Sequence, residues 1–269
     1  MKKNKWVTSS RPYLEYWVTA TLLCSSLGLI VFKNYSLASL PFFLYQAYIA
    51  SIKNKKMFVH FLWLFVAIWL VALSPISTVL TYKNFSTMGV MLSIALFAPF
   101  LINYFLDISN PIKYNFAFKQ WKKYQYHYLL YTLFFAVTLV PFYLKQWPYL
   151  NWSVHKTFES IFLLFMGTNL LWLWDELFFI NTIFSTLLEY VSFPVANLVQ
   201  ATLFCTFLFE LWFDSWGPIF IFPFALSQGY IFYKSHSLWF VICIHLILDF
   251  ILYLSLLSAH GIFSKTVIF

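Results

Sequence analysis

The feature that most constrains the fold is an apolar run from Ser237 to Leu257 that is long enough to cross a lipid bilayer. A transmembrane helix needs about 20 mostly apolar residues, because each residue advances about 1.5 Å through a hydrocarbon core about 30 Å thick. Eight further apolar segments precede this run, at roughly 13–32, 36–52, 57–81, 86–106, 128–144, 158–190, 194–213 and 216–233. The pattern predicts an all-α, polytopic transmembrane helical bundle of about eight to nine spans.

Composition and patterning exclude the other large classes of protein. Of the 269 residues, 62% are hydrophobic and 10% are charged, and the mean hydropathy is +0.76. A soluble domain of this size could not bury that much apolar surface. A transmembrane β-barrel would alternate apolar and polar residues, whereas these runs are continuously apolar. The net charge of +8 does not indicate nucleic acid, because the lysines gather between the apolar runs and act there as topology signals. The expected partner is therefore the lipid bilayer.

The basic residues between the apolar segments alternate in number along the chain. Successive connecting segments carry four, one, three, one, four and two of them: Lys2, Lys3, Lys5 and Arg11; Lys33; Lys53, Lys55 and Lys56; Lys83; Lys113, Lys119, Lys122 and Lys123; Lys145 and Lys156. Cytoplasmic segments carry the excess of Lys and Arg, so the N-terminus is predicted to be cytoplasmic. The first apolar run is longer than that of a signal peptide and lacks a small-residue cleavage site, which predicts an uncleaved first span.

Residues 158–190 form a stretch that is too long for one upright helix. Two spans there would reverse the later topology and put Lys234 outside. We favour one span, followed by a tilted or interfacial continuation that ends at Glu189. Lys234 is then cytoplasmic and the C-terminus lies outside.

Two smaller features have simple interpretations. The odd number of cysteines, all within apolar runs, indicates packing residues rather than a disulfide framework: Cys24, Cys205 and Cys243. The longest polar segment, Asp107–His127, interleaves lysines with aromatic residues, and such segments usually lie on the anionic inner leaflet.

Two pairs of ionisable residues interrupt the apolar runs. Asp175 and Glu176 lie near the middle of 158–190, while His245 and Asp249 lie four residues apart, on one face of the last predicted helix. An acid at membrane depth costs at least about 2.5 kcal/mol on insertion scales, so such groups usually mark function. Other interpretations are a helix end near the interface for the acidic pair and a self-satisfied packing pair for His245 and Asp249. Two sites in one chain favour a shared polar pocket, with one acid within about 8 Å of the His245 ring, a gap that bridging waters can span.

The order of these elements resembles the CPBP family of intramembrane endopeptidases. This family includes type II CAAX prenyl proteases and bacteriocin-processing or Abi-type proteins, and its pattern is EExxxR, then FxxxH, then HxxxN or HxxxD. Asp175 and Glu176 stand at the first motif, and His245 and Asp249 stand at the last. The stretch Ala225–Phe250 looks most like the family, since Gly229, Tyr233-Lys234 and Ser237-Leu238-Trp239 precede His245 much as in its members.

The chain departs from the family pattern at three positions. Asp175 replaces the first glutamate, Ile180 stands at the arginine position, and Leu208 stands where the second-motif histidine is expected, four residues after Phe204. Glu210 does not replace that histidine, because two residues along a helix turn the side chain by about 200°. With Asp214 at i+4, Glu210 is expected at the membrane rim.

The resemblance implies a glutamate-type, membrane-embedded endopeptidase (a hydrolase) that acts on membrane-associated peptides or proteins without a cofactor or metal. Asp175 or Glu176 would activate water, with His245 and Asp249 as supporting groups. The alternative is a catalytically inactive relative that binds a membrane partner or peptide. A third class, metal or proton handling by the same four residues, has no diagnostic ligand spacing.

The expected organisation follows from the extent of the resemblance. Residues 1–157 are predicted to be N-terminal transmembrane helices, 158–257 the CPBP-like core, and 258–269 a short tail. The expected location is the bacterial cytoplasmic (inner) membrane.

Overall fold

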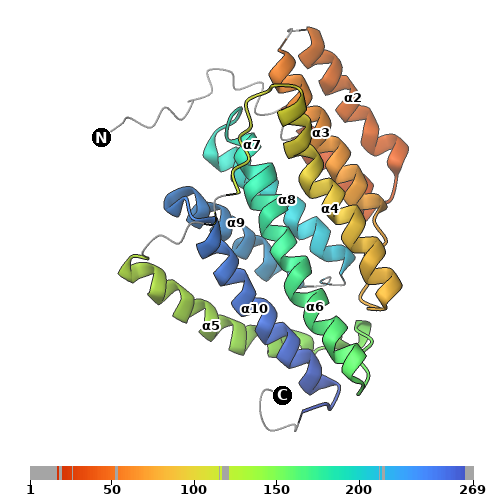
Figure 1. The fold of residues 1–269 in the computed structure, drawn as a ribbon, viewed down its shortest axis with the longest axis vertical. Coiled ribbons are helices and arrows are strands. Elements are labelled where there is room, and N and C mark those ends of the chain that lie inside the picture. Colours follow the sequence, from red (N-terminus) through yellow and green to blue (C-terminus); the bar gives the residue numbers. More distant parts are fainter. Residues whose placement is uncertain are drawn as a thin grey trace.

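The chain folds into a bundle of helices, and the predicted all-α fold class is confirmed (Figure 1). The structure is a computed structural model that describes residues 17, 20–25, 27–51, 54–114, 116, 121–211, 213 and 216–263. No strand occurs within these ranges. Several residues of the sequence analysis lie outside the described part, among them the basic residues before position 17, Lys53, Lys119 and Asp214.

The elements follow one another with short connections. The N-terminal half contains η1 (Leu27–Val31), α2 (Tyr35–Ser51), α3 (Lys55–Leu73), α4 (Tyr82–Phe105), α5 (Lys123–Leu144) and the short η2 (Pro148–Asn151). The C-terminal half contains α6 (Phe158–Asp175), η3 (Glu176–Phe184), α7 (Ser185–Leu187), α8 (Phe193–Glu210), α9 (Gly217–Ser235) and α10 (Leu238–Ala259). Polar side chains cap several starts: Asn54, Thr81 and Ser237 accept hydrogen bonds from backbone N–H groups of the first turn.

Six helical stretches in the described residues are long and apolar enough to cross a membrane. They are α3, α4, α5, the continuous run Phe158–Leu187, α8 and α10. The predicted eight to nine spans also counted α2, α9 and the first apolar run. Of these, α2 has 17 residues, α9 carries Gln228 and Lys234, and the first run appears as the short apolar helix Ala20–Val31. The chain is an integral membrane protein.

Most of the ambiguous stretch 158–190 forms one continuous helical rod, Phe158–Leu187, which agrees with the favoured single span, and residues 188–190 form a turn. Its middle section, η3, is a π-helix, which continues the rod without reversing it. Two ion pairs lie near opposite ends of α8, the helix that follows the rod. Lys56 Nζ lies 2.6 Å from Glu189 Oε2, and Lys33 Nζ lies 2.5 Å from Glu210 Oε1. Glu210 is thus paired at the end of α8, and its place at the membrane rim stays a prediction.

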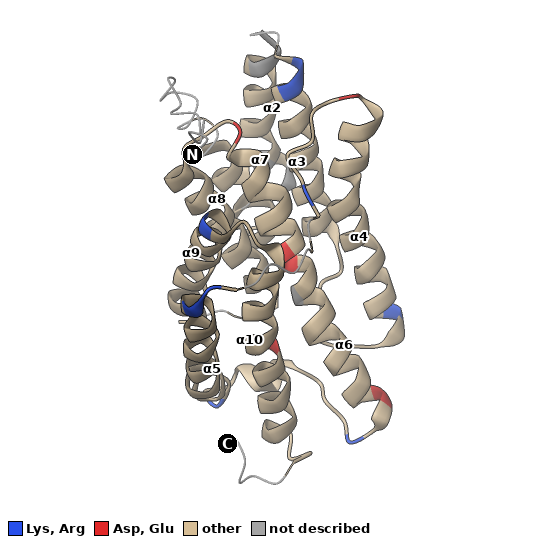
Figure 2. Cartoon of the chain, turned by 60° about the vertical axis from the view of Figure 1, so that its left-hand side comes forward, with Lys and Arg blue, Asp and Glu red and all other residues tan. Residues whose placement is uncertain are grey.

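Charged residues are distributed as the sequence suggested. In Figure 2 the Lys and Arg segments lie at helix ends and in loops, whereas acidic segments also occur within the bundle, on α6 and α10. All three cysteines are free. Cys205 and Cys243 are partly buried, but Cys24 is exposed, so the packing interpretation does not hold for Cys24.

The first part of the loop after α4 packs against the helices. Ile112 is buried, and the Tyr114 ring contacts Phe97 and Phe100. The location of this loop on the inner leaflet stays a prediction. Burial raises the pKa of the Tyr114 phenol, because the charged form would lose its hydration. The aromatic residues of this loop therefore hold it against the bundle.

Candidate active site

The candidate site is assembled where four helices meet near the middle of the C-terminal half. Asp175 ends α6, and Glu176 begins the π-helix η3. His245 and Asp249 lie one turn apart on α10, which packs against α5, α6, α9 and η3. A π-helical section widens the turn and re-aims side chains, and such sections are frequent at functional sites.

Glu176 and His245 are in direct contact. Glu176 Oε1 lies 2.5 Å from His245 Nδ1 and accepts a second hydrogen bond from Gln228 Nε2 at 3.0 Å. The same Gln228 nitrogen donates to the carbonyl of Val241 at 3.4 Å, which ties α9 to α10. These side chains are buried. The expectation that an acid lies within about 8 Å of the His245 ring is therefore confirmed.

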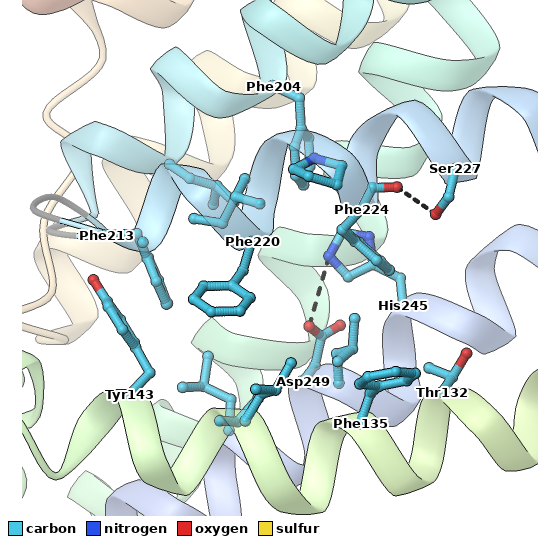
Figure 3. Close-up of a pocket in the computed structure, with 18 of the residues that line it drawn as sticks. Thr132, Phe135, Tyr143, Phe204, Phe213, Phe220, Phe224, Ser227, His245 and Asp249 are labelled. Carbon is cyan, nitrogen blue, oxygen red and sulfur yellow. Dashed lines mark hydrogen bonds and ion pairs between the residues drawn. The ribbon is translucent and has the colours of Figure 1, made fainter.

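The second ring nitrogen of the imidazole is directed toward Asp249. His245 Nε2 lies 3.7 Å from Asp249 Oδ1, a separation typical of an ion pair but too long for a hydrogen bond (Figure 3). Phe204 and Phe224 hold the ring edge-on, with centroids at 5.7 and 5.5 Å. The imidazole is thus fixed between two carboxyl groups and two aromatic rings.

Asp175 contributes differently from Glu176. Its side chain is fully buried, and neither of its oxygens has a hydrogen-bond partner in the described protein. The same holds for both oxygens of Asp249 and for Oε2 of Glu176. The carboxyl groups of Asp175 and Glu176 lie close enough to that of Asp249 for like charges to repel, so the three groups form one cluster. Buried polar atoms are nearly always satisfied, and this cluster therefore has spare capacity to bind water or a ligand.

A cavity of about 590 Å³ opens beside His245 and Asp249 (Figure 3). Its wall is formed by α5, α8, α9 and α10, and its lining is almost entirely apolar and aromatic. His245 and Asp249 are the only acidic or imidazole side chains that line it among the described residues; Asp175 and Glu176 lie behind them.

The positions that depart from the family pattern are also resolved. Leu208, one turn after Phe204 on α8, lines the cavity together with His245 and has a relative exposure of 2%. Ile180 is buried in a small apolar cluster with Ile231, Phe240 and Val241. Leu208 thus faces the cavity from α8, at the position where the resemblance predicts a histidine.

Two contributors were missed by reasoning from the sequence. Gln228 was visible only as a polar residue within the apolar run 216–233, and no motif singled it out. The wall supplied by α5 had no local signal, because a sequence pattern does not show which helices become neighbours. Among the described residues, no three His, Cys, Asp or Glu side chains are arranged to hold a metal ion.

Comparison with known proteins agrees with this geometry. A family model described as "Type II CAAX prenyl endopeptidase Rce1-like" matches residues 157–251, a segment that contains all four candidate residues. Residues 157–251 thus match the CPBP family, as the motifs predicted. No curated protein and no solved structure gives a significant match to the chain. The CPBP segment thus covers the helices from α6 to most of α10, and the helices before it have no assigned counterpart.

Proposed function

We propose that the protein is a membrane-embedded endopeptidase that cleaves membrane-associated peptides or proteins. The observation that carries this proposal is the contact of Glu176 with His245 at the wall of an apolar cavity. A carboxylate and an imidazole in hydrogen-bond contact form a proton-accepting unit of the kind that hydrolases use. The matched family is described as an endopeptidase, which agrees with this chemistry.

In the proposed reaction, a water molecule beside His245 attacks the carbonyl carbon of the scissile peptide bond. The Glu176–His245 pair accepts the proton of that water, the carbon–nitrogen bond breaks, and the pair returns the proton to the leaving amine. Asp249, which faces Nε2 of His245 across 3.7 Å, positions the water. The aromatic walls contributed by α5 and α9 suit an apolar segment of the peptide.

The missing second-motif histidine limits the expected rate. Removal of one oxyanion-stabilising donor costs about 10²–10³ in rate in other hydrolases. Leu208 provides no donor, so we expect slow turnover.

The test uses the full chain in liposomes with a fluorogenic peptide that carries an S-farnesyl cysteine near the cleaved bond. Wild-type protein should release fluorescence, and Glu176→Gln should reduce the rate by about 10²–10⁴, the usual contribution of a general base. Glu210→Gln is the matched control, because it changes a glutamate that pairs with Lys33 at the end of α8 and should cleave at the wild-type rate. Equal rates for Glu176→Gln and wild type would contradict the proposal.

A second candidate is a catalytically inactive CPBP relative that binds a membrane peptide or partner. It is favoured by the leucine at position 208 and by the placement of Asp175 and Glu176 behind the cavity wall rather than in it. In that case the wild-type protein and Glu176→Gln would bind the same peptide with equal affinity, and neither would cleave it.

A further inference from the structure

A second cavity, of about 460 Å³, lies at the end of the bundle where the helices stop and the loops begin. Three segments meet there: the loop after α4, the end of the rod formed by η3 and α7, and the turn between α9 and α10. Its polar lining residues are Asn110, Lys113, Asn181, Ser185, Glu189 and His236. None of the four candidate active-site residues lines this second cavity, which is therefore separate from the apolar one.

Asn181 carries a buried hydrogen-bond donor that is unsatisfied within the described protein. Its side chain has a relative exposure of 1%, it belongs to the lining of the second cavity, and its Nδ2 donor has no hydrogen-bond partner in the described protein. A buried donor without an acceptor is destabilising, and native proteins rarely tolerate one without a reason. An acceptor brought by a ligand would satisfy it.

The charges around the cavity favour an anionic acceptor. Lys113 stands exposed at the rim, and Leu238, the first residue of α10, belongs to the lining, so the positive end of that helix lies beside the cavity. Glu189 is the acidic member of the lining, but its carboxylate is paired with Lys56 at 2.6 Å. The net charge that remains in the lining is therefore positive and comes from Lys113.

The loop that carries Lys113 is held in place. Asn110 Oδ1 accepts a hydrogen bond from the backbone N–H of Ile112 at 3.0 Å, and Asn110 Nδ2 donates to the carbonyl of Phe100 at 3.3 Å. Ile112 is buried, and Figure 1 shows this loop running from α4 alongside α7. The lysine is therefore presented to the cavity by a fixed segment of backbone.

The geometry points to a phosphate-binding site in this cavity, with Asn181 and Lys113 as its donors. Phosphate oxygens accept hydrogen bonds from both kinds of donor and favour a helix N-terminus. Because the cavity lies at helix ends, where lipid headgroups reside, an anionic phospholipid is the source that fits its position. This inference is independent of whether the protein cleaves peptides.

The experiment measures thermal unfolding of the full chain in detergent micelles during titration with phosphatidylglycerol. Diacylglycerol with the same chains lacks the phosphate and serves as the lipid control, and inorganic phosphate is titrated separately as the soluble arm. A ligand that binds the folded state raises the midpoint of unfolding in a concentration-dependent manner. Phosphatidylglycerol should raise it, and diacylglycerol should not.

Two variants locate the effect. Lys113→Gln removes the rim charge, and Asn181→Asp replaces the donor with a carboxylate of nearly the same shape; each should weaken the apparent affinity about tenfold. Lys83→Gln, an exposed lysine at the other end of α4, is the matched control and should bind like wild type. Because Lys113 is exposed, its variant remains informative even if Asn181→Asp does not fold.

The outcomes separate the sources of phosphate. Stabilisation by phosphatidylglycerol that is lost in Lys113→Gln supports a lipid headgroup, and equal stabilisation by inorganic phosphate alone supports a soluble phosphate compound in the same site. Equal effects of phosphatidylglycerol and diacylglycerol, or full binding by both variants, would overturn the inference.

Discussion

His245 occupies the centre of the candidate site because each of its ring nitrogens faces a carboxyl group. Glu176 is the nearer partner, at 2.5 Å from Nδ1, and Asp249 is the more distant one, at 3.7 Å from Nε2. The i, i+4 spacing on α10 placed Asp249 on the same helix face as His245, where it could orient the ring. The structure gives that position to Glu176, since a direct hydrogen bond fixes a tautomer more firmly than an ion pair at longer range. The catalytic roles of these residues remain predictions.

Restoring the lost donor is the sharpest test at the scale of one residue. Leu208→His should increase cleavage of the fluorogenic peptide, by up to about 10²–10³, because the new imidazole would enter the cavity beside His245 and could stabilise the oxyanion. Initial rates in liposomes measure the change. Leu198→His is the control, since Leu198 is exposed on the same helix and should leave the rate unaltered. An unaltered rate for Leu208→His as well would argue that position 208 does not face the reacting bond.

The four ionisable residues could be predicted from sequence because a charge within an apolar run is costly and therefore conspicuous. Gln228 could not, because a neutral amide in a membrane helix is common and reveals nothing of its partner. The same limit applies to Tyr114, whose interleaving with lysines is equally compatible with a membrane surface and with packing against α4. Local sequence shows which side chains need a partner, but the partner itself is set by the packing of distant helices.

At the scale of elements, the π-helical section η3 sets the direction of Glu176 and Asn181. Two side-chain hydroxyl groups donate hydrogen bonds to carbonyl groups five residues back, the spacing of the wider π-helical turn. Thr182 donates to the carbonyl of Leu177 at 2.9 Å, and Ser185 donates to that of Ile180 at 3.4 Å. Nothing in the sequence predicted this section, since it contains neither proline nor glycine. One face of η3 thereby carries Glu176 toward α10 and Asn181 toward the second cavity.

The contact of α8 with α9 depends on a small residue at position 229. Asn197 Nδ2 donates to the Leu226 carbonyl and Gln200 Nε2 donates to the Ala225 carbonyl, at 2.9 and 2.8 Å. Close approach of helices at a small residue, with hydrogen bonds across the interface, is typical of membrane proteins. Gly229 is part of the stretch that resembles the CPBP family, and this packing gives a physical reason for a glycine there.

Gly229→Ala should therefore destabilise the protein by about 1–3 kcal/mol, the usual cost of overpacking. The added methyl group would collide with the Asn197 side chain and come within 2.9 Å of Gln200 Nε2, which would break the bonds between the two helices. Thermal unfolding in detergent measures the loss. Gly89→Ala is the matched control, because a methyl group at that position in α4 meets open space and should leave the midpoint equal or slightly higher. Equal midpoints for the two variants would contradict this account of the contact.

At the scale of the whole molecule, two ion pairs relate the lysine pattern to the fold. Lys56 with Glu189 lies near the start of α8 and Lys33 with Glu210 lies at its end, so the two pairs lie at opposite ends of the bundle. The alternation of basic residues predicts that the end with Lys56 faces the cytoplasm. The orientation, the bacterial inner membrane as location and the division at residues 157 and 257 remain predictions.

Reporter fusions test the orientation. Fusions after Lys56 and Lys123 should read cytoplasmic, and fusions after Lys33 and Lys83 should read external, because segments rich in Lys and Arg are retained inside. A reporter that is active only in the cytoplasm and one that is active only outside should give complementary readings at each site. The reverse pattern would place the second cavity on the outer face.

The cavity wall has a consequence for how the protein can be dissected. The CPBP match begins at residue 157, yet one side of the cavity is built by residues of α5, which precede it: Tyr128, Tyr131, Thr132, Phe135, Leu139, Val140 and Tyr143. Residues 157–251 alone therefore do not contain the whole wall of the cavity. Excised alone, it would retain the acids and the imidazole but leave them open to the acyl chains of the bilayer. A chimaera that joins this segment to the first helices of another CPBP protein would exchange the shape of the cavity without altering its charged groups.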